Sequence, residues 1–140
     1  MRNGESLSLL YVDIDYFKNV NDNYGHHSGN IILRELADIL ISTCRSFDIV
    51  SRNGGEEFSI LLLDCSASHA VRIAERVRKN VETNNFFISN EISINITVSI
   101  GVSTYSDITD NINALLQYSD TALYEAKRTG RNKVVSYNKD

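Results

Sequence analysis

The sequence has no proline, only two cysteines and no long hydrophobic run. Cys44 and Cys65 match none of the spacings of metal-binding or redox cysteines, so we expect reduced thiols. Every apolar run is shorter than the roughly 18 residues of a membrane span, and the first residues lack the pattern of a signal peptide. These absences predict a cytoplasmic domain that makes no membrane contact of its own, and they leave open a tether to a membrane sensor in the full-length protein.

An excess of charge of one sign is missing as well. The 140 residues include 14 lysines and arginines and 18 aspartates and glutamates, a net charge of −4 that is spread along the chain. This balance argues against nucleic acid as a partner and leaves room for a small phosphorylated ligand. The length predicts one domain over residues 1–140, with flexible ends at residues 1–6 and 138–140.

Hydrophobic patterning predicts five strands. Two runs are almost continuously apolar, which is typical of strands buried on both faces, and a third run alternates, which is typical of one buried face. The two apolar strands are Leu7–Ile14 and Phe58–Leu63, the alternating strand is Ile92–Ser103, and shorter strands are expected at Asp48–Ser51 and Lys133–Tyr137.

Apolar residues at helical spacing predict helices between these strands. A short helix is expected over Tyr16–Asn23, followed by a glycine-bounded loop over Gly25–Asn30. Longer helices are expected over residues 32–43, 67–82 and 112–126, the last with a stop at Gly130. The order predicts an α/β sandwich in which helices flank a central, mostly antiparallel five-stranded sheet.

Acidic residues gather where strands are expected to end. Asp13 lies near the end of a central strand, where a carboxylate typically holds a cation or a substrate; a satisfied polar residue is the structural alternative. Asp15 is placed to cap the helix that starts at Tyr16. If the first strand lies beside the predicted hairpin, Asp13 meets Glu56 and Glu57 at one end of the sheet.

Two glycines and two acids form the turn of the predicted hairpin, in the stretch Arg52-Asn53-Gly54-Gly55-Glu56-Glu57-Phe58. Glycine permits positive φ angles and the close approach of a ligand. Two adjacent carboxylates at ~4 Å repel each other by about 4 kcal/mol in an effective dielectric of about 20. A cation between the two acids would offset this repulsion, whereas the hairpin taken alone favours a solvated turn.

Five motifs in order over residues 7–135 resemble one family. They are Asp13-Ile14-Asp15-Tyr16-Phe17-Lys18-Asn19-Val20-Asn21-Asp22 with Gly25-His26, the GGEEF stretch above, Ser99-Ile100-Gly101-Val102, Ala122-Leu123-Tyr124-Glu125-Ala126-Lys127, and Gly130-Arg131-Asn132. On these motifs the chain is identified as a member of the GGDEF domain family, the diguanylate cyclases.

The resemblance implies a fold similar to the palm of nucleotidyl cyclases and polymerases. It also implies the condensation of two GTP to cyclic di-GMP, with two pyrophosphates released, between two domains that face each other as a homodimer. The 3′ hydroxyl of each GTP would attack the α-phosphate of the other.

The resemblance further assigns a metal site and a phosphate site. Asp13, Glu56 and the backbone carbonyl of Ile14 would bind Mg²⁺ or Mn²⁺, and Glu57 would be a further ligand or the base. The phosphates would meet backbone N–H groups and cations, for which simple helix-terminal cations are the structural alternative. These phosphate-binding residues are Tyr16, Phe17, Lys18, Lys127 and Arg131.

Base recognition and feedback are implied by further positions. Asn21 and Asn30 would contact guanine, with His26 in the same loop and Gly54 and Gly55 beside the substrate. Arg45, Asp48 and Arg76 resemble the family's inhibitory site, where cyclic di-GMP binds as an inhibitor.

The sequence departs from the family pattern in two ways. Asn30 stands where the family usually has aspartate, which weakens guanine selection by about tenfold and opens a relaxed purine choice. The helix and the D-x-L-T motif that normally precede the first strand are missing, so we expect a fragment of a longer sensor protein with weak activity on its own. A degenerate domain that binds GTP or cyclic di-GMP as a receptor is the rival hypothesis.

Overall fold

A computed structural model describes residues 6–106 and 112–137 of the chain. The elements follow in the order β1 (Ser6–Ile14), α1 (Phe17–Tyr24), α2 (His26–Thr43), β2 (Ile49–Gly54), β3 (Glu57–Leu63), α3 (Ala67–Glu82), β4 (Phe86–Phe87), β5 (Ser93–Ile94), β6 (Val98–Ser106), α4 (Ile112–Arg128) and β7 (Val134–Ser136). Within these two ranges, no helix is both long and apolar enough to cross a membrane.

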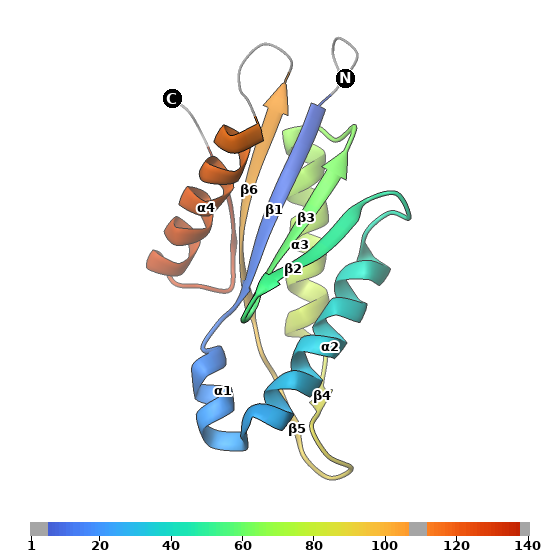
Figure 1. Cartoon of the computed structure of the whole chain (residues 1–140), viewed down its shortest axis with the longest axis vertical. Coiled ribbons are helices and arrows are strands. Elements are labelled where there is room, and N and C mark those ends of the chain that lie inside the picture. The colour runs from blue at the N-terminus through green and yellow to red at the C-terminus, as the bar shows by residue number, and fades with distance from the viewer. Residues whose placement is uncertain (1–5, 107–111, 138–140) are drawn as a thin grey trace.

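The central sheet has five strands in the order β2-β3-β1-β6-β7 (Figure 1). β1 lies in the middle and pairs antiparallel with β3 and with β6, β2 and β3 form an antiparallel hairpin, and β7 runs parallel to β6. The predicted α/β architecture with a mostly antiparallel five-stranded sheet is therefore confirmed.

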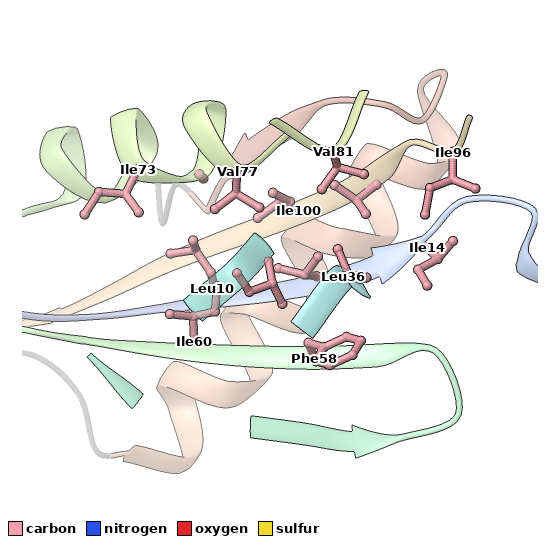
Figure 2. Close-up of a cluster of buried hydrophobic side chains, with 14 of the residues drawn as sticks. Leu10, Ile14, Leu36, Phe58, Ile60, Ile73, Val77, Val81, Ile96 and Ile100 are labelled. Carbon is pink, nitrogen blue, oxygen red and sulfur yellow. The ribbon is translucent and has the colours of Figure 1, made fainter. Parts of the chain in front are cut away.

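The main hydrophobic core lies between one face of the sheet and helices α2 and α3 (Figure 2). Leu10, Ile14 and Ile60 point from the strands toward Leu36 of α2 and Val77 of α3, and all five are fully buried or nearly so. Each such side chain contributes roughly 1.5–3 kcal/mol when it leaves water. This core fixes β1 and β3 side by side, and with them the acids at their ends.

Helix α4 packs on the opposite face of the sheet, against small residues of β6. Ser99, Gly101 and Ser103 are buried there, and a Cβ atom on Gly101 would lie 2.2 Å from the carbonyl oxygen of Ser119 and 2.3 Å from the nitrogen of Leu123. The prediction that this strand buries one face only was wrong. Its polar positions are small residues that let a helix backbone come close, which the alternating pattern does not reveal.

The predicted strand over Ile92–Ser103 is also divided into two. Ser93 and Ile94 pair with Phe86 and Phe87 in a separate two-stranded sheet, and the main sheet receives only β6, which begins at Val98. The alternating pattern continues through the break because Ile94 and Ile96 remain partly or fully buried. Periodicity alone could not show that the strand changes partners.

Two predictions about helix starts were wrong. The expected loop over Gly25–Asn30 is mostly helical, because α2 begins at His26 directly after Gly25, whose φ of 90° breaks the chain direction. The N–H of Gly29 donates to the carbonyl of Gly25 at 3.2 Å, so the new helix starts within one turn. Asp15 does not cap α1 either. Tyr16 occupies the N-cap position, and its side chain makes no capping hydrogen bond.

Candidate functional site

The acidic residues meet at the end of β1, as predicted. Asp13 is in direct register with Glu57 on β3 and with Ser99 on β6. The N–H of Ile14 donates to the carbonyl of Glu56 at 3.4 Å, which ties the strand end to the hairpin turn. Figure 1 shows this turn beside the connection from β1 to α1.

The hairpin turn is open on the side of its two glycines. Gly54 and Gly55 have φ angles of 113° and 54°, and no atom lies within 4 Å of a Cβ built on either residue. Arg52 braces the turn from within by donating from Nε and Nη2 to the carbonyl of Gly55, at 3.1 and 2.8 Å. A ligand can therefore approach the backbone of the turn closely.

Asp13 is a buried carboxylate with one unpaired oxygen. It is 8% exposed, its Oδ2 accepts a hydrogen bond from Lys127 of α4, and its Oδ1 has no hydrogen-bond partner among the described residues. Burial raises the pKa of Asp13 most, Lys127 lowers it, and the nearby charges of Glu56 and Asp15 raise it further. An unpaired buried carboxylate oxygen fits the preference of Mg²⁺ for hard oxygen ligands.

Glu57 shares this electrostatic environment. Burial raises its pKa most, followed by the negative charges of Asp13 and Asp120, while Lys127 acts in the opposite direction. In the described part of the chain, no three His, Cys, Asp or Glu side chains are gathered closely enough to form a metal site by themselves. The predicted acids are neighbours with the right donor chemistry, and Lys127 is the cation that Asp13 contacts.

The start of α1 and the end of α4 meet beside these acids. Tyr16 has a left-handed φ of 59° and precedes Phe17, the first residue of α1. The guanidinium of Arg131 lies over the Tyr16 ring, 4.7 Å from its centroid. Lys18 is exposed on α1. Lys127 and Arg131 therefore reach the predicted site, and Lys18 faces solvent next to it.

Asp15 has a role that the sequence did not predict. Its carboxylate accepts hydrogen bonds from the Ser99 hydroxyl at 2.7 Å, the Thr97 hydroxyl at 2.7 Å and the backbone N–H of Asn132 at 2.9 Å. It is 3% exposed. Ser99 lies in β6, Thr97 directly precedes that strand and Asn132 lies in the segment after α4, so no local pattern around Asp15 signals these contacts.

The residues predicted to read the base lie along α1 and α2. The Oδ1 atom of Asn21 is buried and has no hydrogen-bond partner within the described ranges. A Cβ atom on Gly29 would lie 2.0 Å from this oxygen, so Gly29 makes room for the Asn21 amide, a contact that the residue pattern did not predict. His26 is exposed at the start of α2.

Asn30 lies one helical turn beyond His26 and is exposed. It lines a hollow of about 440 Å³ between α2 and the β2–β3 hairpin, together with Arg34, Arg52 and Phe58. A second hollow of about 450 Å³ lies between α1 and residues 94–97 and includes Tyr16. The first of these hollows connects Asn30 with the hairpin that carries the glycines.

Residues 1–133 match the family model described as "Diguanylate cyclase, GGDEF domain". The chain belongs to the GGDEF family. Diguanylate cyclase A of Treponema denticola is 47% identical over 130 residues, which cover 93% of this chain and 35% of that protein. The response regulator PleD of Caulobacter vibrioides is 43% identical over 133 residues, which cover 94% of this chain and 29% of that protein. The chain thus spans about a third of the length of these relatives.

Solved GGDEF structures share the fold of this GGDEF domain. The active GGEEF domain of a diguanylate cyclase from Vibrio cholerae has a TM-score of 0.90 and 35% identity, covering 97% of this chain and 85% of that one. The GGDEF domain of DgcB from Caulobacter crescentus, solved in complex with c-di-GMP, has a TM-score of 0.88 and 30% identity, covering 96% of this chain and 79% of that one.

The residues of the predicted inhibitory site lie away from the acidic end of this GGDEF domain. Arg45 donates from Nε and Nη2 to the two oxygens of Asp48, at 2.9 and 2.8 Å, and from Nη2 to the carbonyl of Leu63 at 2.9 Å. The Asp48 side chain is 0% exposed, and Arg45 also lies over the ring of Phe47. Arg76 is exposed on α3.

Proposed function

We propose that this GGDEF domain is a diguanylate cyclase that condenses two GTP into cyclic di-GMP and two pyrophosphates. The observation that carries the proposal is a buried oxygen of Asp13 that has no hydrogen-bond partner in residues 6–106 and 112–137; Asp13 is in register with Glu57, beside the hairpin turn. Lys127 and Arg131 bring two cations to the same end of the sheet. An acidic cluster flanked by cations suits a nucleoside triphosphate with a divalent metal ion.

The phosphates of one GTP would lie between the start of α1 and the end of α4. The first N–H groups of a helix have no partner within the helix, so those of Tyr16 and Phe17 would donate to phosphate oxygens. Lys18, Lys127 and Arg131 would neutralise the negative charge of the triphosphate. The open backbone of Gly54 and Gly55 would allow the nucleotide to lie against the hairpin.

Asp13, Glu56 and the carbonyl of Ile14 would hold Mg²⁺ or Mn²⁺. When bound, the metal would polarise the phosphates and lower the pKa of the attacking hydroxyl. Glu57 would be a further ligand or the base that accepts the proton. In each half-reaction a 3′ oxygen forms a bond to an α-phosphorus, and the bond from that phosphorus to the bridging oxygen of pyrophosphate breaks.

Both half-reactions need two copies of the domain, because each copy would hold one GTP. We therefore expect a homodimer as the active form and a sensor domain elsewhere in the full-length protein. The isolated chain over residues 1–140 would act as one catalytic domain of low activity. Its specific activity should rise with protein concentration, and full activity at nanomolar concentration would contradict this dependence on association.

The function is tested by product identification. The chain is fused to a dimerising coiled coil and incubated with Mg²⁺ and GTP, ATP or both, and the products are identified by mass. Cyclic di-GMP from GTP is expected, with none from Glu57→Ala. Asp38→Ala, an exposed acid on α2, serves as the control for the loss of a carboxylate. If the fused dimer binds GTP and makes no product, the domain is a receptor instead.

Base selection is expected to be less strict than an aspartate at position 30 would give. Asn30 offers a neutral acceptor where a charged one forms stronger hydrogen bonds, and its amide also donates. Asn30→Asp should raise the preference for GTP over ATP by about tenfold. Competition binding of the two nucleotides measures this ratio, and an unchanged ratio would place guanine recognition elsewhere.

Feedback by cyclic di-GMP is proposed for Arg45, Asp48 and Arg76. Arg76 gives the cleaner test, because it is exposed and its removal leaves the Arg45–Asp48 pair intact. Arg76→Ala should weaken cyclic di-GMP binding by calorimetry, while Arg72→Ala on the same helix face should not. Equal affinity of Arg76→Ala and the unchanged protein would contradict the proposal.

A further inference from the structure

Asp15 is a buried carboxylate that has no role in the proposed reaction. No donor in the described part of the chain contacts one oxygen of the neighbouring Asp13, whereas both oxygens of Asp15 accept hydrogen bonds from within the fold. Two of the three donors are the hydroxyl of Thr97, which directly precedes β6, and the hydroxyl of Ser99 in β6. The third is the backbone N–H of Asn132, which lies directly after Arg131.

The segment that Asp15 holds has an unusual backbone. Arg131 and Asn132 both have left-handed φ angles, 64° and 48°, which residues other than glycine rarely adopt. Two such residues in succession persist only when their surroundings hold them in place. The hydrogen bond from the N–H of Asn132 to Asp15 is one such constraint, and it acts next to Arg131.

The side chain of Asn132 is held from the other side by α3. Its Oδ1 accepts a hydrogen bond from Nη1 of Arg78 at 3.0 Å, and its Nδ2 donates to Glu82 at 2.7 Å. Arg78 in turn forms ion pairs with Glu75 and Glu82. Asn132 is therefore fixed by its backbone to Asp15 and by its side chain to α3.

This arrangement acts on two parts of the proposed phosphate site at once. Asp15 immediately precedes Tyr16, whose own left-handed backbone starts α1, and the Arg131 guanidinium lies over the Tyr16 ring. The carboxylate of Asp15 thus connects two parts of the proposed site. One is the start of α1, which offers N–H groups, and the other is Arg131, which follows α4. Without Asp15, the N–H of Asn132 would lose this acceptor and the turn that carries Arg131 would lose its anchor on the sheet.

We propose that Asp15 is a positioning residue that holds Arg131 against the start of α1, so that both face the terminal phosphates of the same nucleotide. The inference rests on the proposed function, since it assumes that Arg131 binds phosphate. Asp15 itself touches no substrate. Its effect should therefore pass entirely through Arg131 and should depend on the phosphate chain of the ligand.

A double-mutant cycle tests this dependence. Binding of a non-hydrolysable GTP analogue is measured by calorimetry for Asp15→Ala, Arg131→Ala and the double variant, each with Mg²⁺. Loss of a charge-assisted hydrogen bond predicts weaker binding by about 10- to 100-fold for each single variant. In the Arg131→Ala background, Asp15→Ala should cause no further loss. Arg128→Ala, an exposed arginine at the same helix end, is the control for the loss of charge.

Two further readouts separate positioning from a merely structural role. GMP lacks the terminal phosphates, so Asp15→Ala should leave GMP affinity unchanged. Asp15→Asn should retain most of the GTP-analogue affinity, because its amide oxygen can accept from Asn132 and its NH₂ group can donate to the Ser99 hydroxyl. A structural defect would weaken GMP binding and GTP-analogue binding alike.

If Asp15→Ala does not fold, Asn132→Gly replaces it in the cycle. Glycine accepts the left-handed backbone and keeps the N–H to Asp15, but it removes the brace to α3. Its loss of GTP-analogue affinity should likewise vanish in the Arg131→Ala background. Additive losses would overturn the inference and leave the proposed function standing. No loss for Arg131→Ala itself would overturn both the phosphate site and the inference.

Discussion

The two ends of β3 each carry a pair of a buried carboxylate and a cation, and the two pairs are built differently. At the Leu63 end, Arg45 donates to both oxygens of Asp48 and to the carbonyl of Leu63. At the Glu57 end, Lys127 contacts one oxygen of Asp13, and the other oxygen has no partner among the described residues. Both carboxylate oxygens of Asp48 accept hydrogen bonds from within the fold, whereas only one oxygen of Asp13 does so in the described part of the chain.

This difference separates a pair that stabilises the fold from a pair whose proposed role is to bind a metal ion. A buried polar atom without a partner costs roughly 1–3 kcal/mol, and repulsion among neighbouring carboxylates adds to that cost. Burial and neighbouring acids raise the pKa values of Asp13 and Glu57, whereas the pair at the other end raises the pKa of Arg45 chiefly through its hydrogen bonds to Asp48. Under the proposed function, a bound metal ion would supply the partner that this oxygen of Asp13 lacks among the described residues.

The largest expected effect is on catalysis at the Glu57 end. Asp13→Asn should lower cyclic di-GMP synthesis at least about 100-fold, because the amide is a poor ligand for a divalent metal ion. Without metal, the same variant should unfold at no lower denaturant concentration than the unchanged protein, since a neutral amide is easier to bury than a carboxylate. Product assays and urea denaturation in EDTA measure the two quantities. A clear loss of stability would erase the contrast between the two ends.

The next largest effect is on stability at the Leu63 end. Asp48→Asn leaves the Arg45 guanidinium without its ionic partner, and breaking a buried pair typically costs 3–5 kcal/mol. We expect about 3 kcal/mol in the free energy of unfolding, at the low end because the Arg45 side chain is 27% exposed. Glu125→Gln, which breaks the exposed pair with Arg128, should change stability by less than about 0.5 kcal/mol. Equal changes in the free energy of unfolding would show that the Arg45–Asp48 pair stabilises the fold no more than an exposed ion pair does.

A third prediction concerns how α4 brings Lys127 to Asp13. A methyl group on Gly101 would meet the backbone of Ser119 and Leu123, so Gly101→Ala should push α4 away from the sheet. We expect a loss of about 2 kcal/mol in stability, within the range for overpacked cores, together with weaker GTP binding. Ser51→Ala, an exposed position on β2, should do neither. A stable Gly101→Ala variant with normal binding would show that α4 has room to shift.

The smallest expected effect is on the pH dependence of stability. The raised pKa values of Asp13 and Glu57 mean that the folded state holds their protons more tightly than the unfolded state, where the ordinary values are 3.8 and 4.5. Both groups therefore destabilise the fold at neutral pH, and this penalty disappears as the pH falls through the raised values toward the ordinary ones.

The double variant Asp13→Asn and Glu57→Gln isolates this contribution. Its stability relative to the unchanged protein should be greatest near pH 7 and should shrink as the pH is lowered toward about 4. Denaturation in EDTA at a series of pH values measures the difference. A difference that grows on acidification would mean that the two pKa values are lowered in the folded state.

Much of the molecule could be predicted because its signals are local. The apolar run before Asp13 predicted the central strand, the amphipathic pattern predicted α3 over residues 67–82, and the glycines predicted the hairpin turn. The convergence of Asp13 with Glu57 followed from placing two strands side by side, and the register of β1 and β3 confirms it.

The features that were missed depend on contacts between distant segments. Asp15 resembles a helix cap in sequence, but its partners Thr97, Ser99 and Asn132 are more than 80 residues away. The small face of β6 resembled a solvent-exposed face until α4 was found to cover it. Gly29 gave no sign that it leaves space for Asn21. Such contacts are set by tertiary packing, which residue patterns do not encode.

The close seating of α4 on Gly101 has a consequence for control of the domain. The backbone of α4 packs directly against β6 at Gly101, with no side chain between them that could rearrange. We therefore expect α4 and the sheet to move together as one rigid body. Lys127 is carried on that body together with Asp13. Under the proposed function, we therefore expect a signal to change how two whole domains associate and not how α4 sits on the sheet.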